Sequence, residues 1–557
     1  MPSFDNHLPP NSVVHQLSGR AAILLILGIT ALAILPFAGK AFHVDDPFFI
    51  QVARHILDHP FNPYSFDYNW YGYPQPVPPI VYNPPLVSYY MAAIGELFGW
   101  SELALHLGFF LFTALSAVGI FRLSGHFTTS PLLATLAAVL TPTFLLSSST
   151  LMLDVPGLAC FIWAVHLWID GLKQDRPRRL LAASLFVCVG VLTKYISLTS
   201  VPLLLVYAVF KRRPLRLWAP YLTLPLLVIG GYALVYHELY GSYPFFSAAS
   251  FSLASKLSNF SLFHDLLVGL AFFGGGLITV LLLTPWCWSN KATSGWALYL
   301  LGLMLVIKYL APVKLISSDT TFSFGQAAEM AIYVTCGTQL LALTLLDLWR
   351  NRNPEGLLLA LWIGGIFVFA SLLSWSVNGR LVLLTAAPAG ILLARRLQQA
   401  PRLREKSALL LWPFLISALI GTLLNMADYR LAGSAKEAAA TVTRQKPDDG
   451  NTIWFFGHWG FQHYMESYGA KAVDTTSTTL LLGDRIVVPE NNSNLQIPDE
   501  VKKHLRLVEE LTLPAFPLAT TLNLQANAGF YSSVFGPLPF TFARSPAERY
   551  WVFTAVP

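Results

Sequence analysis

The sequence predicts a multi-pass, all-α membrane protein that ends in a small α/β domain outside the membrane. Composition is the first reason, because 54% of the 557 residues are hydrophobic and only 12% are charged, which a water-facing surface could not cover. The second is a series of apolar runs of about 17 to 22 residues, each long enough to cross a hydrocarbon core of roughly 30 Å as a helix. The third is that these runs stop at residue 424, after which charges of both signs return.

Between Ala21 and Leu424 we count about thirteen such runs, each a predicted membrane helix. The first, Ala21 to Ala38, is expected to remain as a membrane span. Only Arg20 precedes it as a strong positive charge, and no convincing small-residue cleavage site follows it. The cysteines lie inside or at the ends of apolar runs and are expected to pack rather than form disulfides. They are Cys160, Cys188, Cys287 and Cys336.

Lysine and arginine are distributed unevenly between alternate loops, and this asymmetry predicts the orientation. The richer set is Arg20, Arg122, Lys173, Arg176, Arg178, Arg179, Lys211, Arg212, Arg213, Arg216, Lys291, Arg350, Arg352, Arg395, Arg396, Arg402, Arg404 and Lys406. The alternate set is Lys40, Arg54, Lys194, Lys256, Lys314 and Arg380. We therefore expect a cytoplasmic N-terminus in a cell membrane, most simply a bacterial inner membrane. Residues 39–85, here called the first outer loop, would lie on the extracytoplasmic face.

The net charge of +6 does not indicate a nucleic-acid partner, because the basic residues alternate with spans instead of gathering on one globular face. Membrane lipids are the expected surroundings. Residues 1–424 form the predicted transmembrane domain and residues 425–557 a predicted extracytoplasmic α/β domain. Within the latter, the sequence predicts strands at 452–456, 485–488 and 505–513 and a short helix at 461–468.

An acidic pair, Asp45 and Asp46, directly follows the first span. Carboxylates at the edge of a bilayer are costly and usually functional. Asp46 can cap a helix in which Pro47 takes the first position. Phe48, Phe49, Val52 and Ile56 would share one face of that helix, which we expect to lie along the membrane surface. Asp46 is a candidate catalytic residue, and a purely capping role is an equal alternative for it. Asp45 has no capping role to fill and is the better candidate for chemistry.

A second carboxylate, Asp154, lies on the same predicted side, in the short turn between the third and fourth spans. It could simply begin the fourth helix. Two acids on separate outer loops can also meet over a shared cavity and act as a base and a charge stabiliser. Lys194 and Arg380 are among the few basic residues on this side, so they are candidates for holding a lipid phosphate, with snorkelling to head groups as the alternative.

The sequence does not require a metal or any other cofactor. His43, Asp45 and Asp46 are close together without the spacing of a known zinc site. A divalent cation held by Asp45 and Asp154 beside a phosphate is a further alternative, and sensitivity to a chelator would reveal it. No Gly-rich phosphate loop follows a strand. Gly274, Gly275 and Gly276 lie in an apolar run and predict a close helix contact.

Several motifs together resemble a known family. They are Asp45-Asp46 after the first span, Tyr82-Asn83-Pro84-Pro85-Leu86, Leu97-Phe98-Gly99 followed by Ser101-Glu102, Leu153-Asp154-Val155-Pro156, Leu192-Thr193-Lys194, and Gly379 to Leu384 with Pro388. Their order resembles the GT-C membrane glycosyltransferases, above all family 39, the protein O-mannosyltransferases and the lipid A aminoarabinose transferase. The similarity runs from about residue 20 to 400.

The resemblance implies transfer of a sugar from a polyprenyl-phosphate donor to an acceptor hydroxyl on the outer face, with inversion. It places the base on Asp45, a second acid on Asp154 and contacts with the donor phosphate on Lys194 and Arg380. The acceptor could be a glycan, a lipid or a protein. Two positions depart from the family, since Asn83 and His106 stand where relatives often carry a basic residue. The candidates for acceptor contact or cavity lining are Tyr82, Asn83, His106 and His458.

Two other classes of protein compete with this interpretation. A transporter or flippase for a lipid-linked sugar would also have many spans, but it tends to show paired halves with ionisable groups at midplane. An assembly or sensor protein would need no ordered set of acids. For His458, which lies in an aromatic segment of the C-terminal domain, ordinary core packing is an alternative to acceptor contact.

Overall fold

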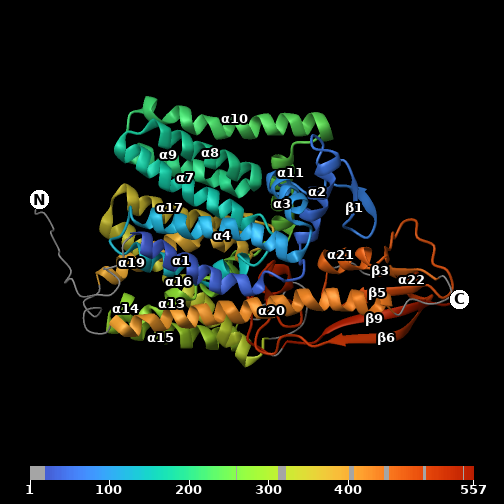
Figure 1. Ribbon diagram of the computed structural model, residues 1–557. Helices are drawn as coiled ribbons and strands as arrows, with labels where there is room; N and C mark the ends of the chain where they lie inside the picture. Colours follow the sequence, from blue (N-terminus) through green and yellow to red (C-terminus); the bar gives the residue numbers. More distant parts are fainter. Residues whose placement is uncertain are drawn as a thin grey trace, which may run out of the picture.

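The computed structural model describes residues 19–258, 260–310, 322–399, 407–444, 451–492, 497, 499–543 and 545–557. Lys314, Arg402, Arg404 and Lys406, used above to predict the orientation, lie outside these residues. The chain forms a large helical bundle, with the β-strands of the C-terminal region gathered at one end of it (Figure 1). This confirms the predicted class, an all-α multi-pass bundle with a small C-terminal α/β region.

The elements follow one another along the chain, with η marking short 3₁₀ or π turns. Up to residue 258 they are α1 (Gly19–Ile34), η2 (Leu35–Phe37), α2 (Asp46–Asp58), β1 (Asp67–Asn69), β2 (Pro74–Pro76), α3 (Leu86–Phe98), α4 (Glu102–Ser124), α5 (Pro131–Val139), α6 (Pro142–Ser147), α7 (Asp154–Gln174), α8 (Pro177–Thr193), η3 (Tyr195–Thr199), α9 (Ser200–Phe210), α10 (Leu215–Tyr240) and α11 (Pro244–Ser258).

Beyond them are α12 (Leu262–Gly276), α13 (Thr279–Leu282), α14 (Thr284–Cys287), α15 (Asn290–Leu305), η4 (Val306–Leu310), α16 (Phe324–Asn351), α17 (Pro354–Val368), η5 (Phe369–Leu373), α18 (Gly379–Val382), η6 (Leu383–Thr385), α19 (Ala386–Gln398), η8 (Ser407–Leu410), α20 (Leu411–Arg444), β3 (Ile453–Phe455), α21 (Trp459–Ser467), β4 (Lys471–Ala472), β5 (Arg485–Pro489), α22 (Asp499–Lys502), β6 (Leu505–Leu513), β7 (Leu522–Asn523), β8 (Ala528–Gly529), η9 (Ser533–Phe535) and β9 (Glu548–Ala555).

Among the described residues, nine helices are long and apolar enough to cross a membrane, or ten if the bent pair α11 and α12 forms one span. The shorter apolar segments 86–98 and 195–210 fall below that length. The predicted number of about thirteen is therefore not confirmed, and the placement of α2 along a membrane surface stays a prediction. Two of the spans, α7 and the stretch from α18 through α19, are the most enclosed and form the centre of the bundle.

Helices α12 and α16 approach each other closely through glycines. A Cβ atom on Gly274 would collide with the carbonyl oxygen of Tyr333, and one on Gly337 would collide with that of Leu270. Small residues at such positions let two backbones come into contact inside a membrane. The predicted close helix contact at the Gly274 segment is thus confirmed.

The C-terminal region contains a five-stranded sheet in the order β4-β3-β5-β9-β6. β3 is parallel to β4 and β5, and β9 is antiparallel to both β5 and β6. The three predicted strands match β3, β5 and β6, and α21 begins two residues before the predicted helix. The strand β9 was not predicted, although it lies between β5 and β6.

Helix α20 continues across the predicted domain boundary at residue 424, because its 34 residues run from Leu411 to Arg444. After the sheet begins, residues 519–543, here called the C-terminal segment, pack back onto the bundle. Gln326 Nε2 donates to the carbonyl oxygen of Ala526 at 3.0 Å, and Glu329 accepts from the amide of Phe542 at 2.8 Å. The first outer loop, α2 and the C-terminal sheet therefore occupy the same end of the bundle (Figure 1).

Candidate active site

A tight turn places Asp45 at the start of α2. The amide of Asp46 donates to the carbonyl oxygen of His43 at 3.1 Å, and between them Val44 has a φ of +49°. A positive φ is rare for a β-branched residue and persists only where the surroundings enforce it. Asp45 holds the N-cap position, yet its side chain makes no capping hydrogen bond. Its carboxylate is therefore available for contacts outside the helix.

The expectation that Asp46 caps α2 is wrong, because Asp46 is already the first helical residue. Its side chain is fully buried and accepts two backbone amides, that of His43 at 3.1 Å and that of Leu151 at 3.0 Å. Burial raises the pKa of Asp46 to about 7. This carboxyl group joins the strained turn to the loop before α7, which is a structural duty and leaves it no face toward a substrate.

The four remaining charged candidates form one group, here called the charge cluster: Asp45, Asp154, Lys194 and Arg380. The Nη1 atom of Arg380 lies 3.2 Å from Asp45 Oδ2 and 4.0 Å from Asp154 Oδ2. Lys194 Nζ lies 2.6 Å from Asp154 Oδ1. The structure therefore brings the two predicted acids and the two predicted cations together around the guanidinium of Arg380.

Ends of four elements meet at the charge cluster. Asp45 precedes α2, Asp154 is the first residue of α7, Lys194 follows the last residue of α8, and Arg380 lies in the short helix α18. The alternative that Asp154 begins a helix is confirmed. In a membrane bundle, side chains from several helices can converge on one site where those helices end.

The four side chains of the charge cluster differ in exposure. The side chain of Asp45 is 28% exposed, that of Lys194 19%, that of Arg380 16% and that of Asp154 6%. Within the described residues, Arg380 Nε and Asp154 Oδ2 are buried without a hydrogen-bond partner. Asp45 is thus the more accessible of the two carboxylates, whereas Asp154 is almost completely buried and pairs with Lys194.

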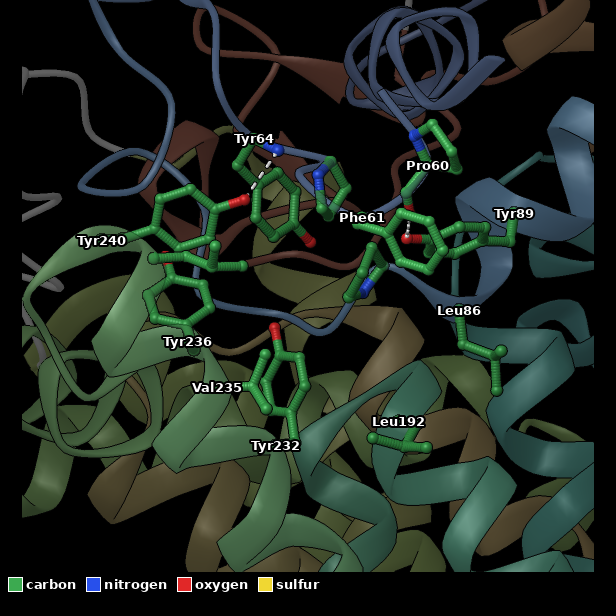
Figure 2. A pocket seen from close by; sticks show the side chains of 13 residues that line it. Pro60, Phe61, Tyr64, Leu86, Tyr89, Leu192, Tyr232, Val235, Tyr236 and Tyr240 are labelled. Atoms are coloured by element: carbon green, nitrogen blue, oxygen red, sulfur yellow. Dashed lines mark hydrogen bonds between the residues drawn. The ribbon is translucent and has the colours of Figure 1, made fainter. Parts of the chain in front are cut away.

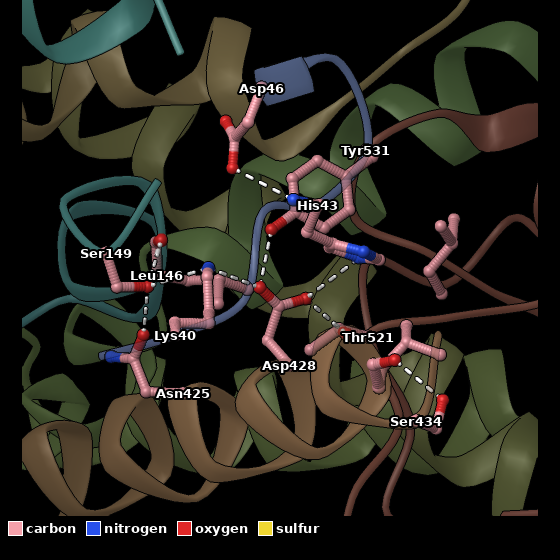
Figure 3. Close-up of polar contacts among 12 residues, drawn as sticks. Lys40, His43, Asp46, Leu146, Ser149, Asn425, Asp428, Ser434, Thr521 and Tyr531 are labelled. Carbon is pink, nitrogen blue, oxygen red and sulfur yellow. Dashed lines mark hydrogen bonds and ion pairs between the residues drawn. The ribbon is translucent and has the colours of Figure 1, made fainter. Parts of the chain in front are cut away.

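Figure 3 shows a second polar group around Asp428, here called the Asp428 network. It contacts the charge cluster through Tyr531, whose carbonyl oxygen accepts from Arg380 Nη2 at 3.3 Å. Asp428 on α20 pairs with Lys40 Nζ at 2.8 Å, and neither side chain is exposed. Asp428 also accepts from Thr521 Oγ1 at 3.0 Å and from Tyr531 Oη at 2.7 Å. Burial lowers the pKa of His43 to about 4, so its 3.7 Å contact with Asp428 is not an ion pair at neutral pH.

The sequence interpretation missed Asp428 and Tyr531. Asp428 carried a usable signal, since an acid within the last long helix is costly unless paired, but the predicted span ended four residues too early to include it. Tyr531 carried none, because a tyrosine in a loop of mixed composition is common.

A pocket of about 290 Å³ opens near the end of α8. Its walls are apolar and aromatic and come from residues 60–64 of the first outer loop, the start of α3, Leu192 on α8 and the last turns of α10. Figure 2 shows the rings of Tyr64 and Tyr232 facing this cavity. Tyr232 Oη is buried and has no hydrogen-bond partner among the residues that the structure describes. Leu192 lies two residues before Lys194, so the pocket and the charge cluster share one end of α8.

The contacts that the structure shows for the predicted acceptor and cavity residues are with residues outside the charge cluster, and their roles stay predictions. Tyr82 packs on Phe251, with ring centroids 6.0 Å apart, and the carbonyl oxygen of Asn83 accepts from Tyr64 Oη at 2.7 Å. His106 is buried on α4, where its Nδ1 bonds the carbonyl oxygen of Glu102.

His458 is also buried, and its ring stacks on that of Trp70 at 5.4 Å. Burial lowers the pKa of His458 to about 4. The packing alternative describes its position well. Asn83 does not line the pocket itself. Its carbonyl oxygen binds the hydroxyl of Tyr64, which does.

In the described parts of the chain, no three His, Cys, Asp or Glu side chains are grouped closely enough to hold a metal ion. Of the residues considered for a cation, Asp45 and Asp154 are instead paired with Arg380 and Lys194.

Comparison with known proteins agrees with this architecture. Residues 82–236, which include Asp154 and Lys194, match the family model described as dolichyl-phosphate-mannose-protein mannosyltransferase. The comparison with curated protein sequences gives no match. The oligosaccharyltransferase of Archaeoglobus fulgidus superposes with a TM-score of 0.50 at 13% identity, over 81% of this chain and 64% of that one. The chain thus spans less than two thirds of the archaeal protein.

Two further solved structures are similar at lower scores. ArnT from Cupriavidus metallidurans bound to undecaprenyl phosphate gives a TM-score of 0.44 at 13% identity, covering 85% of this chain and 94% of that one. The arabinofuranosyltransferase AftD from mycobacteria gives 0.44 at 13% identity, covering 98% and 40%. At such identities the archaeal likeness concerns the fold alone. The chain is therefore a multi-pass membrane protein with the GT-C fold, and its residues 82–236 resemble the protein mannosyltransferase family model.

Proposed function

We propose that this protein is an integral membrane glycosyltransferase that moves a sugar from a polyprenyl-phosphate donor to an acceptor hydroxyl on the extracytoplasmic face. The observation that carries the proposal is the charge cluster, in which the partly exposed carboxylate of Asp45 pairs with Arg380 while Lys194 pairs with the neighbouring Asp154. A base needs access to the acceptor proton, and a departing phosphate needs fixed positive charge. The description of the family model that matches residues 82–236 names a dolichyl-phosphate-mannose donor, which supports the kind of donor.

In the proposed reaction, Asp45 removes the proton of the acceptor hydroxyl as its oxygen attacks the anomeric carbon. The bond between that carbon and the phosphate oxygen breaks on the opposite face, which inverts the configuration. The electron pair leaves with the polyprenyl phosphate, whose additional negative charge is met by Arg380 and Lys194. Asp154 keeps the two cations in place throughout.

Arg380 also regulates the base in this scheme. A phosphate arriving at Arg380 competes with Asp45 for Nη1, so donor binding releases Asp45 for the acceptor. The base then becomes effective only when a donor is present.

The aromatic pocket supports an amphiphilic donor. Its apolar walls suit a hydrocarbon chain, and the charge cluster at the same end of α8 suits the head group that the chain carries. Neither part alone distinguishes a donor lipid from a membrane lipid, but their adjacency matches a phosphate joined directly to a prenyl chain.

The decisive experiment incubates the purified protein with a panel of polyprenyl-phosphate sugars and measures the release of polyprenyl phosphate. Asp45→Asn should lower the rate by about 10²- to 10⁴-fold, the usual contribution of a general base. Asp58→Asn is the matched control, because Asp58 is an exposed carboxylate at the other end of the same helix, and it should leave the rate unchanged.

The stereochemistry of the product provides an independent check, since direct displacement must convert a β-linked donor into an α-linked product. Release of polyprenyl phosphate from no donor would overturn the proposal. Movement of a labelled lipid across vesicles without release of phosphate would favour a transporter instead.

A further inference from the structure

We infer that Tyr531, from the C-terminal segment, is a positioning residue that orients the guanidinium of Arg380 toward the two acids of the charge cluster. The inference rests on the proposed function in assigning Arg380 to the donor phosphate, although the contacts themselves do not depend on it. It makes the C-terminal segment part of the active site and not only a cover over the bundle.

Tyr531 meets Arg380 with two of its parts. Arg380 Nη2 donates to the carbonyl oxygen of Tyr531 at 3.3 Å, and the guanidinium carbon lies 5.8 Å from the centroid of the tyrosine ring. The other terminal nitrogen, Nη1, is the atom that faces Asp45 and Asp154. Because a guanidinium is planar and rigid, fixing Nη2 against Tyr531 determines the direction of Nη1.

The backbone on either side of Arg380 is fixed to the same segment. The amide of Gly379 donates to the carbonyl oxygen of Phe530 at 2.8 Å, and the amide of Ser533 donates to that of Val377 at 2.8 Å. The amide of Val377 donates in return to Ser533 Oγ at 3.1 Å. A Cβ on Gly379 would collide with the Phe530 ring, so the two segments of the chain are in direct contact. Residues 377–380 therefore cannot move without the C-terminal segment.

The hydroxyl of Tyr531 connects this contact to the Asp428 network. It donates to Asp428 Oδ2 at 2.7 Å, while Lys40 Nζ approaches the same oxygen at 2.8 Å. Burial raises the pKa of Tyr531 well above its ordinary value, so the hydroxyl stays protonated and remains a donor. A hydrogen bond to a buried carboxylate is stronger than one between neutral groups. The ring is therefore held at one end by α20 while its face and carbonyl hold Arg380.

Chemical modification of arginine tests the inference without relying on transferase activity. The purified full-length protein is treated with phenylglyoxal, and the modified arginines are quantified by mass spectrometry. Tyr531→Leu removes the ring and the hydroxyl and should raise the modification rate of Arg380 about tenfold, as expected for the loss of a desolvated cation–π contact. Tyr531→Phe keeps the ring under the guanidinium and should give a smaller increase.

Two controls separate positioning from unfolding. Arg395 on α19 is 11% exposed and pairs with Asp347 on α16 at 3.2 Å. It should keep its low reactivity in every variant. Tyr468→Phe alters an exposed tyrosine of the C-terminal region, 43% exposed, and should change neither arginine. Arg380 reacting equally in wild type, Tyr531→Phe and Tyr531→Leu would overturn the inference, as would a parallel rise at Arg395.

The kinetic readout links the inference to function. With a donor that the wild type accepts, Tyr531→Leu should lower kcat about tenfold while the KM for the acceptor stays unchanged, because the acceptor meets Asp45 and not Arg380. An unchanged kcat would contradict the inference. Should the wild type itself release no polyprenyl phosphate, the proposed function fails while the modification experiment still decides the role of Tyr531.

Discussion

Lys40 and Asp428 form a buried ion pair whose stability depends on the presence of both partners. Both side chains are fully buried, 2.8 Å apart, and Asp428 is further satisfied by Thr521 and Tyr531. A buried pair gains little over apolar residues of similar volume, but breaking it leaves an uncompensated charge. Stability should therefore respond far more to the loss of one partner than to the neutralisation of both.

Lys40→Met should lower the free energy of unfolding by about 3–5 kcal/mol, measured by thermal unfolding in detergent, because Asp428 is left buried and unpaired. Lys211→Met is the control, since Lys211 pairs with Glu355 at 2.7 Å but is 29% exposed, and it should cost at most about 1 kcal/mol. The double variant Lys40→Met/Asp428→Asn should recover part of the loss. A double variant less stable than Lys40→Met alone would contradict this account.

At the level of single residues, the two acids that meet Arg380 could be predicted, and the residues that support the charge cluster could not. Asp45 and Asp154 stand out because carboxylates are rare near lipid, and the structure does bring both to Arg380. Asp46 is also a carboxylate directly after the first span. It accepts hydrogen bonds from the amides of His43 and Leu151, and the second of these depends on the position of the loop before α7 in the folded protein. Such long-range backbone contacts leave no local trace in a sequence.

At the level of elements, the contact between α12 and α16 depends on two glycines that allow the backbones to touch. Gly274→Ala should destabilise the protein by about 1–3 kcal/mol through overpacking, because its Cβ would meet the backbone of Tyr333. Gly364→Ala on α17 is the matched control, since no atom lies within 4 Å of its added Cβ. It should be neutral or slightly stabilising. Equal melting temperatures for the two variants would count against the close contact.

Elements with a strong local pattern were predictable, whereas those defined by partners were not. The strand at 505–513 matches β6 to the residue, because apolar and polar residues alternate at both of its ends and Pro514 follows it. The last strand, β9, has buried and half-buried positions that alternate only in part, and its pairing with both β5 and β6 arises from the sheet. The end of α20 was placed too early for a related reason: its second half is polar, and packing against α21 and the sheet sustains it.

For the whole molecule, the predicted orientation can be tested by labelling with cysteine reagents. The four native cysteines are buried, so an introduced cysteine gives an unambiguous signal. Ser477→Cys, in the C-terminal region, should react with a membrane-impermeant maleimide in intact cells, whereas Arg178→Cys, in the first turn of α8 at its predicted cytoplasmic end, should react only after permeabilisation. Both positions are exposed. Reaction of Arg178→Cys in intact cells would reverse the proposed topology.

The C-terminal segment has a consequence for how the protein is made. Translation starts at the N-terminus, so Asp45, Asp154 and Arg380 are synthesised and can enter the membrane while Tyr531 does not yet exist. We expect a message with a premature stop codon shortly before that tyrosine to specify a protein that inserts normally but leaves its arginine without support. Such a truncated protein would then be inserted normally into the membrane but would have low catalytic activity.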